Sequence, residues 1–412
     1  MRPTRSLTFS LIPGFSSISE ALSHRKAEME ALAANQRSAV VKAPIRSFLR
    51  YFLWLGTVGF GGPIALAGYM QRDLVEQRKW ISKQDYLEGL AFAQLAPGPL
   101  AAQLAIYLGF VRAGIVGATL VGFVFILPSF LMVMALGAAY VRYGGLPWMQ
   151  ALFYGIGATV IAIITRAAAK LLRVVLGKDV LLWLIFLVLG VSTAITEREI
   201  AWLFVAGGFL ALLVKAFPRQ LKTRVAVLLI SSGATAPLSG TLWQLLIFFT
   251  KASLFVFGSG LAIVPFLHGG VVQEHHWLTE RQFIDAVAVA MITPGPVVIT
   301  VAFIGFLVAG FSGAVAAALG VFLPIYLVVV FVGPYYKRFA KNPQLHAFVR
   351  GVTVAATGAI AGAVFVLARR SIHDLPTAAI ALLSFAVLLR WEIPEPLVIG
   401  VAGVVGLLLY HQ

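Results

Sequence analysis

The chain has 412 residues, of which 60% are hydrophobic and only 12% are charged, whereas a soluble domain carries about 25% charged residues. This composition excludes a soluble globular protein. The chain has 32 basic and 16 acidic residues, a net charge of +16. Because the basic residues lie between long apolar runs, we attribute them to membrane topology and expect no nucleic-acid partner. The absence of cysteine excludes disulfides, thiolate metal sites and cysteine nucleophiles.

Residues 1–47 form a basic, polar extension before the first apolar run. Within it, the stretch 7–15 is too short, and too interrupted by serine and proline, for the hydrophobic region of a signal peptide. We interpret the extension as a cytoplasmic tail, with an organellar targeting sequence as the alternative.

Two series of apolar stretches follow, separated by a linker at 217–246. A bilayer crossing needs about 20 apolar residues, and several stretches are shorter or are interrupted by glycine and proline. The first series occupies 51–70, 88–111, 115–140, 151–172, 180–195 and 200–216. The second occupies 241–268, 286–309, 313–334, 348–368, 376–390 and 395–410. We predict an all-α polytopic membrane protein, with repeats at 48–216 and 247–412.

The two series are related by a nearly constant spacing of 197 residues, which becomes 196 after a one-residue slip. Distinctive residues recur in the same order, which indicates an internal duplication. The pairs are Phe60-Gly61 with Phe257-Gly258, Trp80 with Trp277, Pro97-Gly98-Pro99 with Pro294-Gly295-Pro296, Gly117 with Gly313, Leu127-Pro128 with Leu323-Pro324, and Gly155 with Gly351.

Charge placement favours inverted over parallel repeats. If every stretch crosses once, many basic residues fall on the outer side. If the first two stretches of each repeat are instead re-entrant hairpins, and 225–249 adds one crossing, most basic residues fall on one side and the second repeat is upside down.

Each repeat opens with a glycine-rich break and continues to a helix interrupted by Pro-Gly-Pro. Proline removes a backbone donor and clashes with the preceding turn, so these helices must unwind. Unwound backbone is tolerated at membrane depth only where it is buried in protein or lines a cavity. Broken helices at corresponding positions of two repeats point to the substrate site of a transporter. Kinks that serve only packing are the alternative.

The acidic residues favour an anionic substrate. We place every carboxylate in a tail, in a loop or at a segment end, with Glu88 and Asp285 closest to the interior. A cation carrier usually keeps a carboxylate at membrane depth, whereas an anion needs helix N-termini, hydroxyls and amides. The predicted backbone donors are Gly61, Gly62, Gly98, Gly258, Ser259, Gly260 and Gly295. The predicted side-chain donors are Gln94, Gln103, Thr293 and Thr300.

A basic loop lies between the two broken elements of the first repeat, and it contains Arg72, Arg78, Lys79 and Lys83. It either draws an anion toward the site or is an ordinary positive-inside loop. The neighbouring His275 and His276 lack the i, i+4 spacing of a helical ligand pair, so we predict no metal site. No nucleotide-binding or hydrolase motif is present, so we predict neither ATP-driven transport nor an enzyme.

The two halves resemble the chromate ion transporter family in its long two-domain form. The matching stretches are FGGPIALAGYMQRD from Phe60, LPSF from Leu127, FGSGLAIVPF from Phe257 and FLP from Phe322. The resemblance implies homologous, oppositely oriented halves in a bacterial inner-membrane protein. Members of this family extrude chromate and confer chromate resistance, with sulfate as the competing oxyanion.

The resemblance also implies a set of functional residues. The family motif falls on Gly61, Gly62, Pro63, Gln94, Pro97, Gly98 and Pro99 in the first half, and on Gly258, Gly260, Pro294, Gly295 and Pro296 in the second. Many relatives carry a polar residue after the first motif where this chain has Ala65-Leu66, which shifts the expected binding toward backbone donors. The expected partners are a chromate- or sulfate-like oxyanion and the lipid bilayer, with a homodimer as the candidate assembly and no cofactor.

Alternative functions keep the same fold. One is a permease for sulfate or another oxyanion, and another is an anion channel or scaffold whose breaks only shape a pore or an interface. A membrane oxidoreductase is disfavoured because the chain has no cysteine and no flavin or haem motif.

Overall fold

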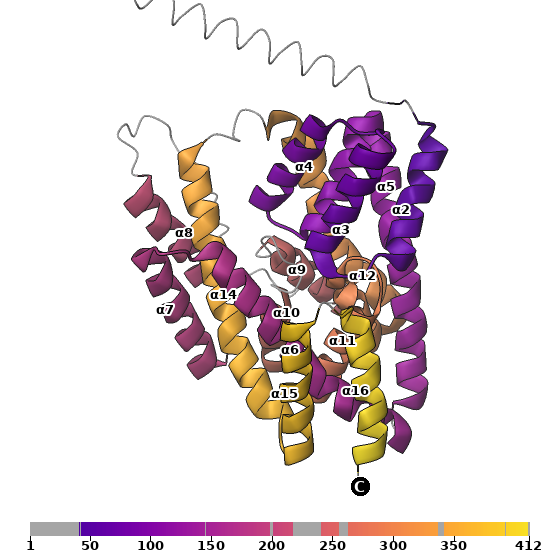
Figure 1. The fold of residues 1–412 in the computed structure, drawn as a ribbon, viewed down its shortest axis with the longest axis vertical. Helices are drawn as coiled ribbons and strands as arrows, with labels where there is room; N and C mark the ends of the chain where they lie inside the picture. The colour runs from indigo at the N-terminus through magenta and orange to yellow at the C-terminus, as the bar shows by residue number, and fades with distance from the viewer. Residues whose placement is uncertain are drawn as a thin grey trace, which may run out of the picture.

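The computed structural model describes residues 41, 43–144, 146–197, 201–216, 240–254, 263–336, 342–391 and 393–410. These residues form helices and contain no strand (Figure 1), which confirms the all-α prediction. Within these described ranges, four helices are long and apolar enough to cross a membrane: Leu100–Tyr143, Pro147–Arg173, Val297–Tyr335 and Pro343–Ser371. The predictions for residues 1–40, for 217–239 and for Gly258, Ser259 and Gly260 lie outside the described residues.

The helices of the two halves correspond in order and, for most pairs, in length. The first half contains α2 (Ile45–Val58), α3 (Gly62–Met70), the π-helical turn η1 (Gln71–Gln77), α4 (Lys83–Leu95), α5 (Leu100–Tyr143), α6 (Pro147–Val175), α7 (Val180–Thr196) and α8 (Ala201–Lys215). The second contains α9 (Thr241–Leu254), α10 (Ile263–His268), η3 (Gly269–Glu274), α11 (Glu280–Ile292), η4 (Val297–Ile299), α12 (Thr300–Val332), η5 (Gly333–Tyr335), α14 (Pro343–Ser371), α15 (Leu375–Arg390) and α16 (Glu395–Leu409).

Capping residues explain where the helices before each Pro-Gly-Pro begin. Ser82 accepts a hydrogen bond from the backbone of Asp85 at the start of α4, and Thr279 forms a capping box with Gln282 at the start of α11. These caps start both helices several residues before the apolar stretches. Glu88 and Asp285 therefore lie inside helices, and the expectation that every carboxylate lies in a tail, in a loop or at a segment end is wrong.

The longest helices, α5 and α12, are each folded back at an alanine–glycine pair. Ala113-Gly114 and Ala309-Gly310 have non-helical backbone angles, with φ of +58° and +62° at the glycines. A helix cannot continue through this conformation, which favours glycine. Each helix therefore has a short arm that starts at a Pro-Gly-Pro and a long arm that runs on to the next helix.

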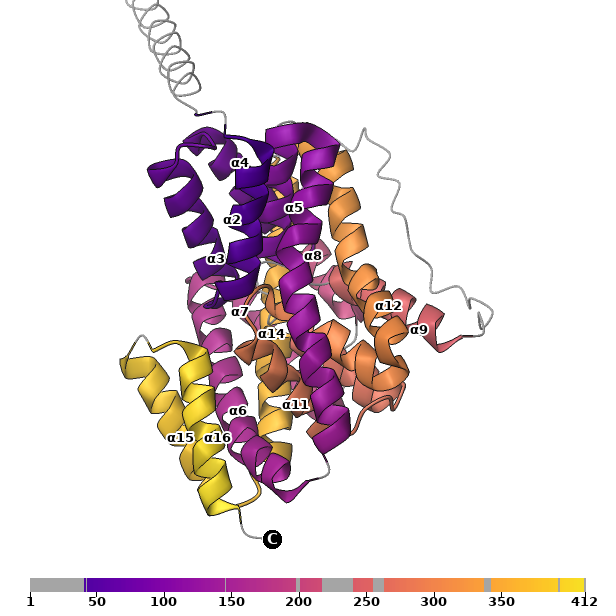
Figure 2. The ribbon, with the colours of Figure 1, turned by 90° about the vertical axis from the view of Figure 1, so that its right-hand side faces the viewer.

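The long arms of α5 and α12 pack against each other in opposite directions. The hydroxyls of Thr119, early in one arm, and Tyr326, late in the other, are 2.8 Å apart. Phe130 contacts Phe311 further along, with ring centroids 6.2 Å apart. Figure 2 shows the two helices side by side along the molecule, α5 in magenta and α12 in orange.

The terminal helix pairs are exchanged between the halves. Helices α7 and α8 pack against α14 of the second half, and α15 and α16 pack against α6 of the first (Figures 1 and 2). Glycines permit this approach, because a side chain at Gly155 would overlap the Ala402 carbonyl, and one at Gly351 would lie 2.5 Å from the Gly207 carbonyl. Each half therefore completes its packing with helices of the other.

Candidate functional site

The two Pro-Gly-Pro breaks have the same geometry. Helix α4 ends at Leu95 and α5 begins at Leu100, while α11 ends at Ile292 and η4 begins at Val297. The central glycines have φ of +130° and +100°, a backbone region that residues with a side chain rarely adopt. The backbone conformation itself therefore requires glycine at both positions.

The second-half break is held by residues of the first half. The Gly295 N–H donates to the Gly59 carbonyl at 2.8 Å, directly after α2 ends. A side chain on Gly295 would overlap Ser129 Oγ, and Ser129 donates to the Gly56 carbonyl at 3.2 Å. The glycine-rich break after α2, the Pro128-Ser129 segment of α5 and the second Pro-Gly-Pro therefore meet at one point.

The first-half break has the matching neighbour in the second half. A Cβ on Gly98 would lie 2.8 Å from Ile325 Cγ1. Ile325 follows Pro324 in α12, as Ser129 follows Pro128 in α5. Each break therefore packs against the residue after the proline in the other half's long helix. The sequence prediction omitted Ser129 and Ile325, although the repeated Leu-Pro pair marks both positions.

Buried backbone donors follow each break. The first N–H groups of a helix have no partner within the helix. The N-cap residues here are Pro99 and Pro296, and neither provides a side-chain cap. The donors of the first turn of α5 belong to Leu100, Ala101 and Ala102, which are at most 4% exposed. Donors of this kind, at the positive end of a helix dipole, suit an anion.

Three of the four predicted side-chain donors are occupied within their own segments. Gln103 is fully buried and its Nε2 donates to the Pro97 carbonyl at 2.5 Å, which leaves Oε1 without a partner among the described residues. Thr293 donates to the Val289 carbonyl at 2.6 Å and Thr300 to the Val297 carbonyl at 2.7 Å. Gln103, Thr293 and Thr300 therefore stabilise the broken segments.

The remaining predicted residues differ in exposure. Pro294, Gly295 and Pro296 are buried, as are Gly98 and Pro99, whereas Pro97 is half-buried. Gln94, on the last turn of α4, and Gly61, before α3, are exposed, while Gly62 and Pro63 are half-buried. The structure thus places the two Pro-Gly-Pro segments in the core and the start of α3 and Gln94 at accessible positions.

A buried carboxylate lies on the helix that precedes the second break. Asp285 is 3% exposed and accepts a hydrogen bond from the Tyr140 hydroxyl at 2.7 Å, which joins α11 to the end of α5. Its counterpart Glu88 interacts electrostatically with Tyr336, which is the counterpart of Tyr140. The carboxylates nearest the breaks therefore form a second symmetric pair of contacts between the halves.

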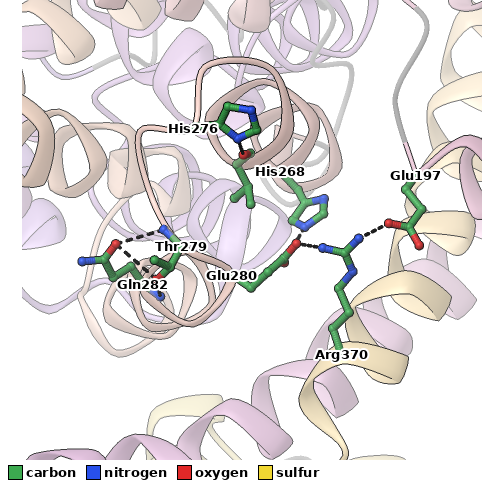
Figure 3. Close-up of polar contacts among 8 residues, drawn as sticks. Glu197, His268, His276, Thr279, Glu280, Gln282 and Arg370 are labelled. Carbon is green, nitrogen blue, oxygen red and sulfur yellow. Dashed lines mark hydrogen bonds and ion pairs between the residues drawn. The ribbon is translucent and has the colours of Figure 1, made fainter.

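A separate charged cluster joins the second half to α7 (Figure 3). Arg370 forms ion pairs with Glu280 and Glu197, and His268 Nε2 lies 2.7 Å from Glu280 Oε2. The adjoining cavity has a volume of about 530 Å³. Because two carboxylates surround one guanidinium, this cluster does not suit a dianion. Its ion pairs instead connect α14 to α11 and to the end of α7. His276 stands apart from this cluster, and its Nδ1 donates to the Val272 carbonyl at 2.9 Å.

The fold and the paired breaks define a class of protein. A helical membrane bundle with two corresponding halves, each broken at the same place, is an architecture found in many transporters. The family model for chromate transporters matches residues 46–212 and 243–407, and the chain belongs to this family.

Relatives match over most of the chain. The chromate transport protein of Cupriavidus metallidurans is 59% identical over 374 residues, which cover 89% of this chain and 93% of that protein. The probable chromate transport protein of Synechococcus elongatus is 55% identical over 89% of this chain and 96% of its own length. The chromate transport protein of Pseudomonas aeruginosa is 32% identical over 87% of this chain and 91% of its own. No solved structure matches the chain.

Proposed function

We propose that the protein is a secondary transporter that exports chromate, or a closely similar tetrahedral oxyanion, across the bacterial inner membrane and so confers chromate resistance. The observation that carries the proposal is the pair of broken helices whose buried N–H groups lie where the two halves meet. The membership in the chromate transporter family supports the choice of substrate.

The two halves form an inverted repeat with a cytoplasmic N-terminus. Support comes from the opposite directions of the equivalent helices α5 and α12. The reciprocal contacts of Gly295 with Ser129 and of Gly98 with Ile325 are those expected of a two-fold axis between the halves. Such an axis in the membrane plane permits alternating access, in which the site between the halves opens first to one side of the membrane and then to the other.

The dianion binds to backbone donors at the starts of α5 and η4, in the segments Leu100–Ala102 and Val297–Val298. The helix dipoles favour negative charge there, and the glycines of both Pro-Gly-Pro segments let an anion approach the peptide groups closely. Gln103, Thr293 and Thr300 shape the site by holding the unwound turns. Gln94 and the segment Gly61–Pro63 lie on the accessible side and serve entry.

The membrane potential supplies the direction. Moving one charge across 100 mV is worth about 2.3 kcal/mol, so the exit of a dianion from a negative-inside cell gains about 4.6 kcal/mol. At about 1.4 kcal/mol per factor of ten, this gain sustains a gradient of about three decades. Export of the dianion therefore needs no ATP.

The proposal is tested by chromate uptake into inverted membrane vesicles with an imposed potential, with sulfate as competitor. Accumulation that depends on the potential is expected, and vesicles that accumulate sulfate but not chromate would instead indicate a sulfate permease. Counterflow of labelled chromate separates a transporter from an anion channel of the same fold, because only a carrier exchanges bound substrate. Absence of uptake for both anions contradicts the proposal.

A further inference from the structure

A second candidate site lies at the outer part of α2, beside η1 and away from the Pro-Gly-Pro breaks. A cavity of about 620 Å³ is lined there by three arginines, one carboxylate and aromatic rings. The arginines are Arg50, Arg72 and Arg78, and the carboxylate is Asp73, so the lining has a net charge of +2. We call this cavity the arginine pocket.

Two of the three cations of the arginine pocket are held in place by neighbouring side chains, and the three together are only partly neutralised. The Arg78 guanidinium lies 5.2 Å from the centroid of the Tyr51 ring and 4.8 Å from that of Trp80. Arg72 pairs with Asp73 at 2.7 Å. Among the described residues, no carboxylate lies within ion-pair distance of Arg50 or Arg78, so two guanidinium groups keep their donors for a ligand.

A buried hydroxyl also points to a ligand. Tyr51 is only 3% exposed and lines the pocket. The neighbouring Asp73 carboxylate acts on the Tyr51 hydroxyl electrostatically and as a hydrogen-bond partner, but within the described part of the chain their geometry falls short of a full hydrogen bond. Buried polar groups normally make well-formed hydrogen bonds, and an oxygen of an anion bound in the pocket would give the Tyr51 hydroxyl a second, better aligned acceptor.

The second half has the same framework with the pocket filled. The counterparts of Tyr51, Arg78 and Trp80 are Phe248, His275 and Trp277. The rings of His275 and Trp277 are stacked with centroids 4.3 Å apart, and Phe248 packs edge-on against Trp277 at 5.6 Å. The fold can therefore be built at this position without charge, which means that the arginines of the first half are not required for packing.

The surroundings of the pocket fit a lipid. Helix α2 runs inward from the edge of the molecule (Figure 1), and Gly59 at its C-terminal end contacts the second Pro-Gly-Pro. Below Arg50 on the same face, Trp54 and Val58 are 50% and 45% exposed. A basic, tryptophan-bearing pocket at the end of an exposed apolar strip matches a phosphate headgroup with its acyl chains along the helix.

We propose that the arginine pocket binds the phosphate of an anionic phospholipid. Guanidinium groups recognise phosphate oxygens through paired N–H donors, and the Tyr51 hydroxyl adds a further donor. Trp54 and Val58 contact the acyl chain. The positive-inside rule places this pocket at the cytoplasmic face, and the second half has no matching arginines to bind lipid at the other face.

The test measures lipid binding to the purified full-length protein in neutral detergent. Native mass spectrometry compares the retention of phosphatidylglycerol and phosphatidylcholine by the wild type, by Arg50→Gln, and by Arg50→Gln with Arg78→Gln. Arg50 is exposed and Arg50→Gln disturbs no packed contact, so this variant remains informative if the double variant does not fold. Lys83→Gln is the matched control, because Lys83 is an exposed cation next to the pocket but outside its lining.

The wild type is expected to prefer phosphatidylglycerol. Each lost arginine should weaken its binding about fivefold, while phosphatidylcholine binding and the Lys83→Gln variant change less than about twofold. Equal retention of the two lipids, or unchanged phosphatidylglycerol binding in Arg50→Gln, overturns the proposal. A parallel titration with chromate and inorganic phosphate identifies the source of the phosphate-like ligand. If these free anions bind with the same arginine dependence and the lipid does not, the lipid assignment is wrong.

Discussion

The substitution Gly295→Ala tests the central site most directly. Gly295 has φ of +100°, and its N–H donates to the Gly59 carbonyl at 2.8 Å. An added Cβ would overlap Ser129 Oγ and lie 3.1 Å from Ser129 Cβ. The variant therefore opposes the backbone conformation and the packing of the break at the same time.

The size of the effect follows from these two costs. A residue with a side chain in a sparsely populated backbone region costs about 1–3 kcal/mol. Overpacking of a close contact costs about 1–3 kcal/mol more. The native break is then disfavoured by about 2–6 kcal/mol, and at about 1.4 kcal/mol per factor of ten its ratio to alternative conformations of the segment falls at least about 30-fold.

The assay is the initial rate of chromate uptake into inverted vesicles, divided by the amount of folded protein in the membrane. Gly295→Ala should lower this rate at least about 30-fold, and adding Ser129→Ala should restore part of it because the overlapping hydroxyl is gone. Gly68→Ala is the control, since a Cβ on Gly68 meets no atom within 4 Å and its φ is ordinary. A Gly295→Ala variant that transports at more than half the wild-type rate refutes the reasoning.

Three further predictions concern contacts between the halves, each measured by thermal unfolding in detergent. Tyr140→Phe should lower the free energy of unfolding by about 1–3 kcal/mol more than Asp285→Asn does, because it leaves a buried carboxylate without its donor. Equal shifts of the two variants contradict this. Gly351→Ala should cost about 1–3 kcal/mol by overpacking a backbone contact, and a neutral result contradicts the exchanged packing. Arg370→Gln should cost about 1 kcal/mol at low salt, since its partners are partly exposed. Adding Glu197→Gln to Arg370→Gln should recover part of that loss. A double variant less stable than Arg370→Gln alone contradicts a stabilising ion pair between these residues.

The sequence predicted the features that depend on local chemistry. The Pro-Gly-Pro segments end helices wherever they occur, and the composition places the chain in a membrane whatever its tertiary contacts. The position of Glu88 and Asp285 was mispredicted because hydrophobicity locates an apolar stretch but not its cap. The caps Ser82 and Thr279 start α4 and α11 among polar residues, N-terminal to the apolar stretches. Both carboxylates therefore lie within these helices.

Contacts between the halves could not be predicted from the repeat alone. A constant spacing relates a residue to its own copy, such as Pro128 to Pro324, but does not identify the neighbour of either one. The structure pairs each break with the other half's long helix, and each terminal helix pair with the other half's scaffold. The sequence likewise does not reveal the partner of the Gln103 amide, which could donate to a bound anion or to the backbone of the neighbouring turn. Only its 2.5 Å contact with the Pro97 carbonyl assigns it to the turn.

The way the halves differ bears on the direction of transport. Two identical halves would bind an anion equally from both sides of the membrane, because the backbone donors at the two breaks correspond. The chain departs from equality in the side chains around that backbone, because Gly295 meets the polar Ser129 whereas Gly98 meets the apolar Ile325. It departs again at the surface, where the arginine pocket of the first half corresponds to stacked rings in the second. Under the proposed function, the shared backbone provides the binding site and the unequal side chains distinguish its two faces, while the membrane potential sets the outward direction of the dianion.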